Sequence, residues 1–188
     1  MTFLADKTSW GGRAAVGHVT KLSALPFAEF GILANMLASA GVSVTALPAT
    51  DLFLMGREFD YNPPRGVTQM HRLLAHGVNC SISTNNVLNP FTPFGDCSLI
   101  RMANLYANVA QIGTPAAMAS CLDMVTSHSA NLLNLGDYGI AVGKPADLVV
   151  LDCESRSKAV AEIAPALFGL NAGRRVFTQP AAQLHRPD

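Results

Sequence analysis

Polar side chains that can take part in chemistry follow two short apolar runs of the sequence. His18 ends the run RAAVGH (13–18), and Asn85 comes just after VNCSIS (78–83). An imidazole can bind a metal or carry a proton, whereas an amide donates and accepts hydrogen bonds but cannot ionise. The loop that holds Asn85 contains no carboxylate, histidine or cysteine before Asp96. Asn85 can therefore bind a polar ring or hold a turn, but it cannot serve as a general base.

Other polar residues in these loops allow two interpretations each. Thr20 and Lys21 can contact an anion or a carbonyl group, or they can form a solvated turn. Asn86 can hydrogen-bond a heterocycle or hold the turn that follows the strand. Asp51 and Arg57 flank a short apolar segment, where we expect them to form an ion pair that steadies a long loop.

Three further histidines are expected to serve the structure. His71 and His76 fall on one predicted helix and are expected on its outer surface, and His128 lies at a helix junction, where it can pack or cap. The lone His18 can serve the structure in the same way, or it can contact a metal or a substrate. The sequence has no Ser-His-Asp order, H-E-x-x-H pair, P-loop or H-x-E…P-C-x-x-C deaminase signature.

Three units of strand followed by helix must position these residues. The strands are expected at 13–18, 42–47 and 78–83, with ends 29 and 36 residues apart, a spacing typical of a parallel sheet. The carboxyl ends of parallel strands meet at one edge, where α/β enzymes keep their reactive groups. Thr68 is expected to cap a helix, and Asp96 or Ser98 the next one. Helices are expected over about 26–40, 68–76, 98–110, 114–125 and 127–135. The sequence thus predicts an α/β fold.

The pattern changes after residue 135. GDYGIAVGKPADLVVLD (136–152) indicates a turn, a short strand, a turn and an apolar strand, and GRRVFTQP (173–180) indicates another strand. We therefore expect an α/β part over 1–135 and a small β module with a tail over 136–188. Three such units do not close a sheet that has to be covered on both faces, and a complete eight-unit barrel takes about 250 residues. The chain is expected to hold part of a larger sheet.

The composition argues against several kinds of partner. The net charge is zero, with 13 basic and 13 acidic residues and no basic tract, so nucleic acid and anionic membranes are not expected as main partners. Charged residues make up 14%, against roughly 25% in a typical soluble protein. This low value fits either an Ala-rich domain or a surface that something else covers.

The cysteines and the apolar runs bear on the compartment. The four cysteines form no CxxC pair, and the opening MTFLADKTSWGG lacks the features of a signal peptide. No apolar run approaches the roughly 18 residues that span a bilayer. These features favour a cytoplasmic protein with reduced thiols.

Several long segments, in matching order, resemble the carboxyl-terminal half of cytosine-deaminase-like enzymes of the amidohydrolase superfamily. They are GHVT (17–20), LFLMGR (52–57), PRGVT (64–68), GVNCSISTNNVLNPFTPFG (77–95) and VTSHSANLLNLGDYGIAVGKPADLVVLD (125–152). The resemblance implies a metal-dependent (β/α)8 barrel of TIM type with a small β-sandwich built from both chain ends. The three strands would be barrel strands six to eight. Residues 1–135 would then be a partial barrel, and 136–188 a β-sandwich remnant and tail.

The resemblance also implies a reaction and a site. The family hydrolyses C–N bonds, including deamination of cytosine and related ring amines, with zinc or iron supplying the hydroxide and a carboxylate shuttling the proton. His18 matches the family's strand-six histidine, which serves the metal or its water. Asn85 stands where the family has an aspartate that contacts the metal and acts as acid and base. The H-x-H of strand one and the histidine and glutamate of strand five are absent. Because a catalytic zinc normally has three protein ligands, the chain alone is expected to bind no metal and to be inactive.

Three functions of different classes stay open at this point. The chain can be a fragment of a cytosine-deaminase-like enzyme, or a non-catalytic binding or assembly module on the same scaffold. It can also be half of a split enzyme that is active with a chain carrying strands one to five. The family's substrates are small heterocyclic amines. The protein partners expected are further copies of this chain or a complementary amino-terminal half.

Overall fold

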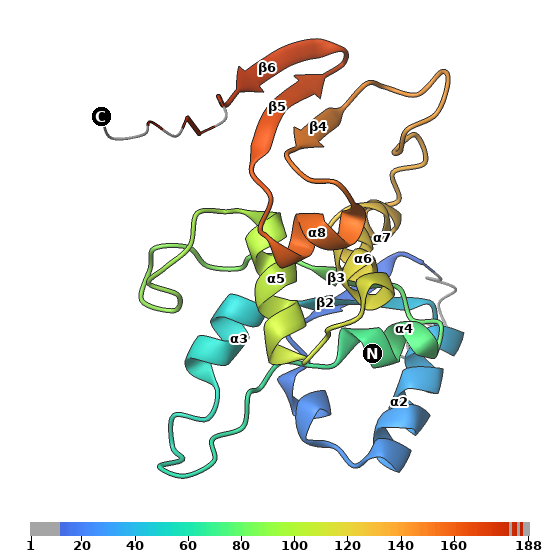
Figure 1. Cartoon of the computed structure of the whole chain (residues 1–188). Helices are drawn as coiled ribbons and strands as arrows, with labels where there is room; N and C mark the ends of the chain where they lie inside the picture. Colours follow the sequence, from blue (N-terminus) through green and yellow to red (C-terminus); the bar gives the residue numbers. More distant parts are fainter. Residues whose placement is uncertain (1–11, 181, 184, 186–188) are drawn as a thin grey trace.

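A three-stranded parallel sheet forms the centre of the molecule (Figure 1). The computed structural model describes residues 12–180, 182–183 and 185. The opening segment MTFLADKTSWGG, in which we expect no signal peptide, lies outside the described part except for Gly12. The strands lie in the order β1-β2-β3, with Val44 paired to Val16 on one side and to Cys80 on the other. They are β1 (Ala14–Gly17), β2 (Val42–Ala46) and β3 (Cys80–Ile82). The prediction of a mixed α/β fold with three parallel strands is confirmed.

Helices connect the strands, and most of them lie where the sequence predicts them. They are η1 (Thr20–Ala24), α2 (Phe27–Ser39), α3 (Pro48–Leu54), α4 (Met70–Ala75), α5 (Leu99–Val109), α6 (Pro115–Met124) and α7 (Ser127–Leu132). The hydroxyl of Ser98 accepts a hydrogen bond from the N–H of Arg101 and caps α5, as expected. The cap predicted for Thr68 is wrong, because its hydroxyl donates instead to the carbonyl of Val19, 2.7 Å away. Helix α3 lies where a loop was expected.

The hydrophobic core fills the space between one face of the parallel sheet and four helices. The strands contribute Val44, Ala46, Cys80 and Ile82, and α2, α4, α5 and α6 contribute Phe30, Leu73, Met102, Tyr106 and Met124, among others. Burying the larger of these side chains, such as Ile82 and Leu73, contributes roughly 1.5–3 kcal/mol each. The other face of the sheet is polar, since Ser43 and Ser81 are buried there and the hydroxyls of Thr45 and Ser81 lie 2.8 Å apart. This alternation follows the period of two along a strand.

A small antiparallel sheet forms the second layer, beyond α5 and α6 (Figure 1). It contains β4 (Leu148–Leu151), β5 (Ala166–Asn171) and β6 (Arg174–Thr178), in the order β4-β5-β6. Helix α8 (Arg156–Ala161) connects β4 to β5 and packs against α6 and α5. The predicted strands at the ends of this region are confirmed, whereas no strand forms over 136–147. None of the helices built by the described residues combines the length and hydropathy needed to cross a membrane.

His71 is joined to the buried Tyr106, so its expected position on the outer surface is wrong. The N–H of His71 donates to the Tyr106 hydroxyl (3.1 Å), and that hydroxyl lies 3.0 Å from Nδ1 of the ring. The oxygen accepts from the backbone, and its own proton can be donated to Nδ1 when that ring nitrogen is unprotonated. Burial lowers the pKa of His71 below its ordinary 6.5, and the neighbouring Arg72 adds to the effect.

The lowered pKa of His71 predicts a pH-dependent stability. An unfolded His71 titrates near pH 6.5 and the folded one at lower pH, so between these values the unfolded chain binds more protons. The contribution of His71 to the free energy of unfolding should therefore be fully present above pH 6.5. It should be lost as the pH falls through the folded pKa. Urea unfolding at pH 7.5 and 5.5 measures this loss. His71→Gln, which does not titrate, should show a smaller loss over the same range, and equal losses in both proteins would contradict the assignment.

Candidate functional site

His18 lies at the carboxyl end of β1 on a strained turn. Its φ is 65° and that of Val19 is 48°, in the left-handed region that β-branched residues rarely enter. Such conformations cost about 1–3 kcal/mol each and persist only where the surroundings hold them. Two contacts do so here: the N–H of His18 donates to the carbonyl of Thr45 (3.1 Å), and the fully buried Thr68 donates to the carbonyl of Val19. The strain is therefore maintained at the residue that carries the imidazole.

Asp51 holds one side of this imidazole. It lies in the first turn of α3, which Pro48 begins, and its Oδ1 is 2.5 Å from Nδ1 of His18. Burial raises the pKa of Asp51, and its contact with His18 opposes that shift. The expected ion pair between Asp51 and Arg57 is wrong. Arg57 donates to the carbonyl of Phe53 (2.9 Å) and stacks over that ring.

Asn85 holds the other side of the imidazole. Its amide nitrogen Nδ2 lies 3.1 Å from Nε2 of His18, although the two residues are 67 positions apart. The structure therefore brings together the two predicted site residues, at the meeting point of strand ends. His18, Asp51 and Asn85 form a trio, and Asp51 is the member whose role the sequence missed. Its position five residues after the end of β2, at the start of a proline-initiated helix, was the available signal.

The loop behind Asn85 is fixed by hydrogen bonds. Oδ1 of Asn89 accepts from the N–H groups of Phe91 and Thr92 (3.0 and 3.1 Å), and Asn86 accepts from the Asn89 amide (2.8 Å). The hydroxyls of Thr92 and Thr50 are buried and lie 2.6 Å apart. Asn86 therefore holds the turn. Helix α3 therefore contacts two loops. Thr50 bonds Thr92 in the loop after β3, and Asp51 bonds His18 at the end of β1.

The other predicted polar residues lie apart from this trio. Lys21 is exposed on η1, and the carbonyl of Thr20 accepts from the hydroxyl of Ser23 (2.7 Å), so this segment forms a turn. His76 is exposed, as expected, with Nδ1 2.9 Å from the side-chain oxygen of Asn35. His128 packs at the helix junction, where its carbonyl accepts from the Asn79 amide (3.1 Å).

The trio does not provide the ligands of a catalytic metal. A catalytic zinc takes three protein ligands and keeps one position for water. Here Nδ1 of the imidazole is hydrogen-bonded to Asp51, and a neutral amide, that of Asn85, lies next to Nε2. In the part of the chain that the structure describes, no three His, Cys, Asp or Glu side chains gather closely enough to hold a metal ion. These residues can orient an imidazole and bind a polar group beside it, and they do not by themselves fit the metal.

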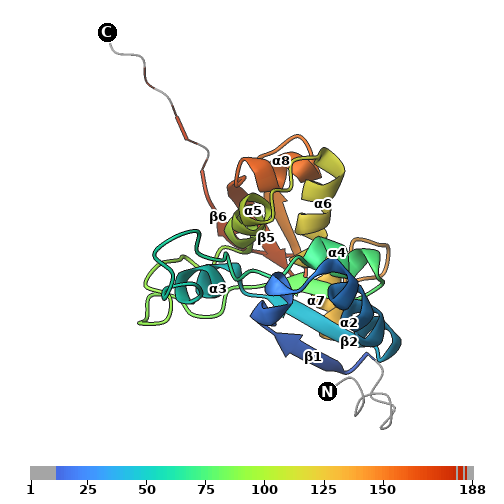
Figure 2. The same cartoon turned by 90° about the horizontal axis from the view of Figure 1, so that it is seen from below.

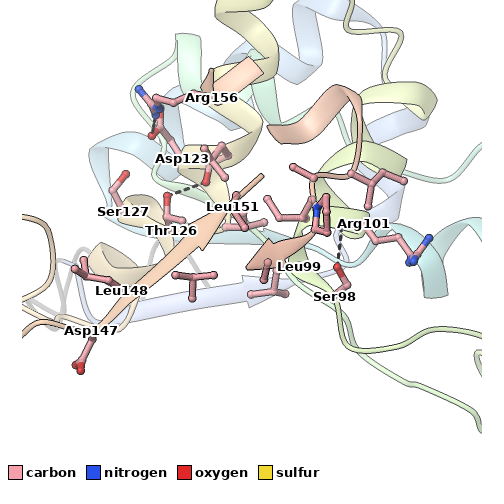
Figure 3. A pocket seen from close by; sticks show the side chains of 18 of the residues that line it. Ser98, Leu99, Arg101, Asp123, Thr126, Ser127, Asp147, Leu148, Leu151 and Arg156 are labelled. Atoms are coloured by element: carbon pink, nitrogen blue, oxygen red, sulfur yellow. Dashed lines mark hydrogen bonds and ion pairs between the residues drawn. The ribbon is translucent and has the colours of Figure 1, made fainter. Parts of the chain in front are cut away.

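A separate groove lies between the two layers of the molecule (Figure 3). It has a volume of about 1130 Å³, and an apolar floor that includes Leu148 and Leu151. The ion pair of Arg156 with Asp123 lies at its rim, and Arg101 lies at the opposite end (Figure 3). His18, Asp51 and Asn85 do not line it. The groove is therefore a feature of the contact between the layers and not of the trio.

The chain is similar to known amidohydrolases over nearly its whole length. The model of the Amidohydrolase family Amidohydro_3 matches residues 2–177. A pterin deaminase of Rhizobium rhizogenes is 30% identical over 154 residues, which are 81% of this chain and 35% of that protein. The structure of 5-methylcytosine deaminase from Klebsiella pneumoniae, liganded with 5-fluorocytosine, superposes with a TM-score of 0.93 and 26% identity. That superposition covers 99% of this chain and 45% of the enzyme.

A more distant structure shares the fold and holds a metal. It is an adenosine deaminase from Xanthomonas campestris with bound zinc, with a TM-score of 0.62 and 22% identity over 90% of this chain and 38% of that one. The chain therefore spans about a third of the length of its curated relative and less than half of these two structures.

Proposed function

The chain belongs to the amidohydrolase family, and from this premise we propose that it is the carboxyl-terminal part of a cytosine-deaminase-like enzyme. The family reaction would be metal-dependent hydrolysis of a C–N bond in a cyclic amidine, that is, deamination of a heterocyclic amine. The similarity to a pterin deaminase and to a 5-methylcytosine deaminase supports this class of substrate. In the proposed function the chain is inactive alone and needs a second chain.

The open sheet supports the assignment of β1, β2 and β3 to barrel strands six, seven and eight. In the described part of the chain β1 and β3 each pair with one strand only, so neither outer edge of the sheet is paired with a further strand. Figure 2 shows β1 at one of these edges. Ala15 and Gly17, on the polar side of β1, are exposed. In the proposed assembly, 1–135 is the partial barrel and 136–188 supplies the β-sandwich piece, whose remaining strands belong to the partner chain.

The contact between His18 and Asn85 is the observation that carries the proposal. These two residues match the family's site positions on strands six and eight, and their side chains meet at 3.1 Å although the strands are not neighbours in the sheet. In the complete enzyme the metal, zinc or iron, would supply an activated hydroxide. An amide at position 85 can hydrogen-bond a ring but can neither take nor give a proton near neutral pH. This inability of Asn85 to exchange a proton is the observation that favours the alternative, a non-catalytic binding module.

Complementation tests the proposal. The chain is co-expressed with an amino-terminal half taken from a pterin deaminase, and the two are purified through a tag on the second chain. We expect a stable complex, because the partner covers the open sheet, and ammonia release from pterin or 5-methylcytosine once Asn85→Asp restores the acid. General acid–base catalysis contributes roughly 10²–10⁴-fold, so the unmodified complex should be slower by that factor.

Each outcome of this experiment has a meaning. Failure of the two chains to co-purify would contradict the split-barrel assignment. Equal turnover of the unmodified and Asn85→Asp complexes would show that the amide at position 85 does not lower the rate of deamination. A complex that forms but stays inactive with Asn85→Asp would favour the binding module. Asp123→Asn, the reverse exchange of a carboxylate and an amide in an ion pair away from the trio, is the control and should leave both complexes unchanged.

A further inference from the structure

We propose that Asp51 is the positioning residue of the site: it fixes His18 as the tautomer with its proton on Nδ1, so that Nε2 faces position 85 as a hydrogen-bond acceptor. The inference rests on the proposed function only in taking His18 as a site residue. It concerns the side chains of this chain and no bound group.

The geometry of the pair supports this role. Asp51 is only 2% exposed, whereas the side chain of His18 is 43% exposed, so the carboxylate is fixed within the protein and the imidazole reaches the surface. Oδ1 lies 2.5 Å from Nδ1. The other carboxylate oxygen, Oδ2, is buried and has no hydrogen-bond partner among the described residues. Burying a polar atom without a partner is costly. Among the described residues, His18 is the side chain to which the Asp51 carboxylate is bonded.

The amide on the far side of the ring agrees with this tautomer. Nδ2 of Asn85 can only donate, and it lies 3.1 Å from Nε2 of His18. Nε2 must therefore be an acceptor, and the ring proton is on Nδ1, where the carboxylate of Asp51 accepts it. In neutral imidazole one nitrogen is a donor and the other an acceptor, so one hydrogen bond decides the role of the other nitrogen.

The backbone on both sides of the pair is held in place as well. The left-handed turn at His18 is fixed through Thr68 and Thr45, so the backbone that carries the ring is held in place. Asp51 is fixed through α3, whose preceding residue Thr50 is tied to the loop after β3. One helical turn therefore sets the distance between the imidazole and the loop that carries Asn85.

The tautomer can be read directly in the full chain. Nitrogen-15 NMR of protein labelled at histidine, at one fixed pH of about 8, distinguishes a protonated from an unprotonated ring nitrogen. His18→Gln identifies the His18 signals among those of the five histidines. We expect His18 with its proton on Nδ1. In Asp51→Asn the new amide can donate to an unprotonated Nδ1, which favours the tautomer with the ring proton on Nε2, the wrong tautomer that this exchange produces in triads.

The control is Asp123→Asn, in which an ion-paired carboxylate away from His18 becomes an amide. It should leave the His18 signals unchanged, and circular dichroism checks that all variants are folded. A proton on Nε2 in the unmodified chain, or an unchanged tautomer in folded Asp51→Asn, would overturn the inference.

A second measurement separates this inference from the proposed function. In the complemented enzyme with Asn85 kept, so that its amide still faces Nε2 of His18, Asp51→Asn should lower kcat by about 10²–10⁴-fold, the contribution of a correctly placed proton-transfer group, with a much smaller change in KM. If complementation yields no activity while the tautomer shifts as expected, the proposed function fails and the positioning role stands. A drop in KM and kcat alike, with no tautomer change, would reduce Asp51 to a structural residue.

Discussion

The isolated chain is expected to release no measurable ammonia from cytosine, 5-methylcytosine or pterin. Deamination of a ring amine needs an activated hydroxide, a donor to the ring nitrogen and a base for the hydroxide's proton. Metal binding lowers the pKa of water from about 15.7 to about 7, and general acid–base catalysis adds roughly 10²–10⁴-fold. The described residues offer one imidazole and one amide for these tasks, His18 and Asn85. An ammonia-release assay measures the result.

Restoring the acid alone is expected not to rescue the reaction. Asn85→Asp returns a carboxylate to within reach of His18, but two side chains do not make the three-ligand site of a catalytic zinc. Elemental analysis of the unmodified chain should accordingly find less than one tightly held zinc or iron per chain. Clear turnover by the unmodified chain, or one metal ion per chain, would overturn this account. The complemented complex is the positive control for the assay.

The chain is expected to self-associate at micromolar concentration. Both edges of the parallel sheet are free within the described residues, and unpaired edges template association. Ile32 and Met36, one turn apart on the outer side of α2, are 62% and 46% exposed, and Val176 on β6 is 62% exposed. Exposed apolar area of this extent drives proteins together. Light scattering should give masses that are multiples of 19.8 kDa.

Charged substitutions on α2 test which surface is responsible. Ile32→Glu combined with Met36→Lys removes the exposed apolar stripe without touching the core and should shift the population toward smaller species. Ile140→Glu, at an apolar residue that is 90% exposed in the loop before β4, is the matched control and should change the mass little. A monodisperse 19.8 kDa monomer of the unmodified chain would contradict the expectation.

The strands and most of the helices could be predicted because their signals are local. The apolar alternation of VSVTAL and the cap-then-proline order at Thr114 and Pro115 act within one element, and the structure contains both elements. Helix α3 was missed, since a proline-initiated helix of seven residues within a long loop gives a short signal. Thr68 was misassigned as a cap because its hydroxyl bonds a carbonyl 49 residues away. Contacts at that separation leave no periodic trace in a sequence.

The sequence by itself determined which side chains stand at the strand ends and what they cannot do. His18 and Asn85 follow their strands at fixed positions, and an amide at position 85 cannot ionise in any fold. Only the tertiary structure decided that Asp51 turns away from Arg57 and toward His18, and that His71 joins Tyr106. The physical reason is that parallel strands bring their ends together across connections of tens of residues. The partners of a side chain there depend on sheet order and helix placement, which no local pattern encodes.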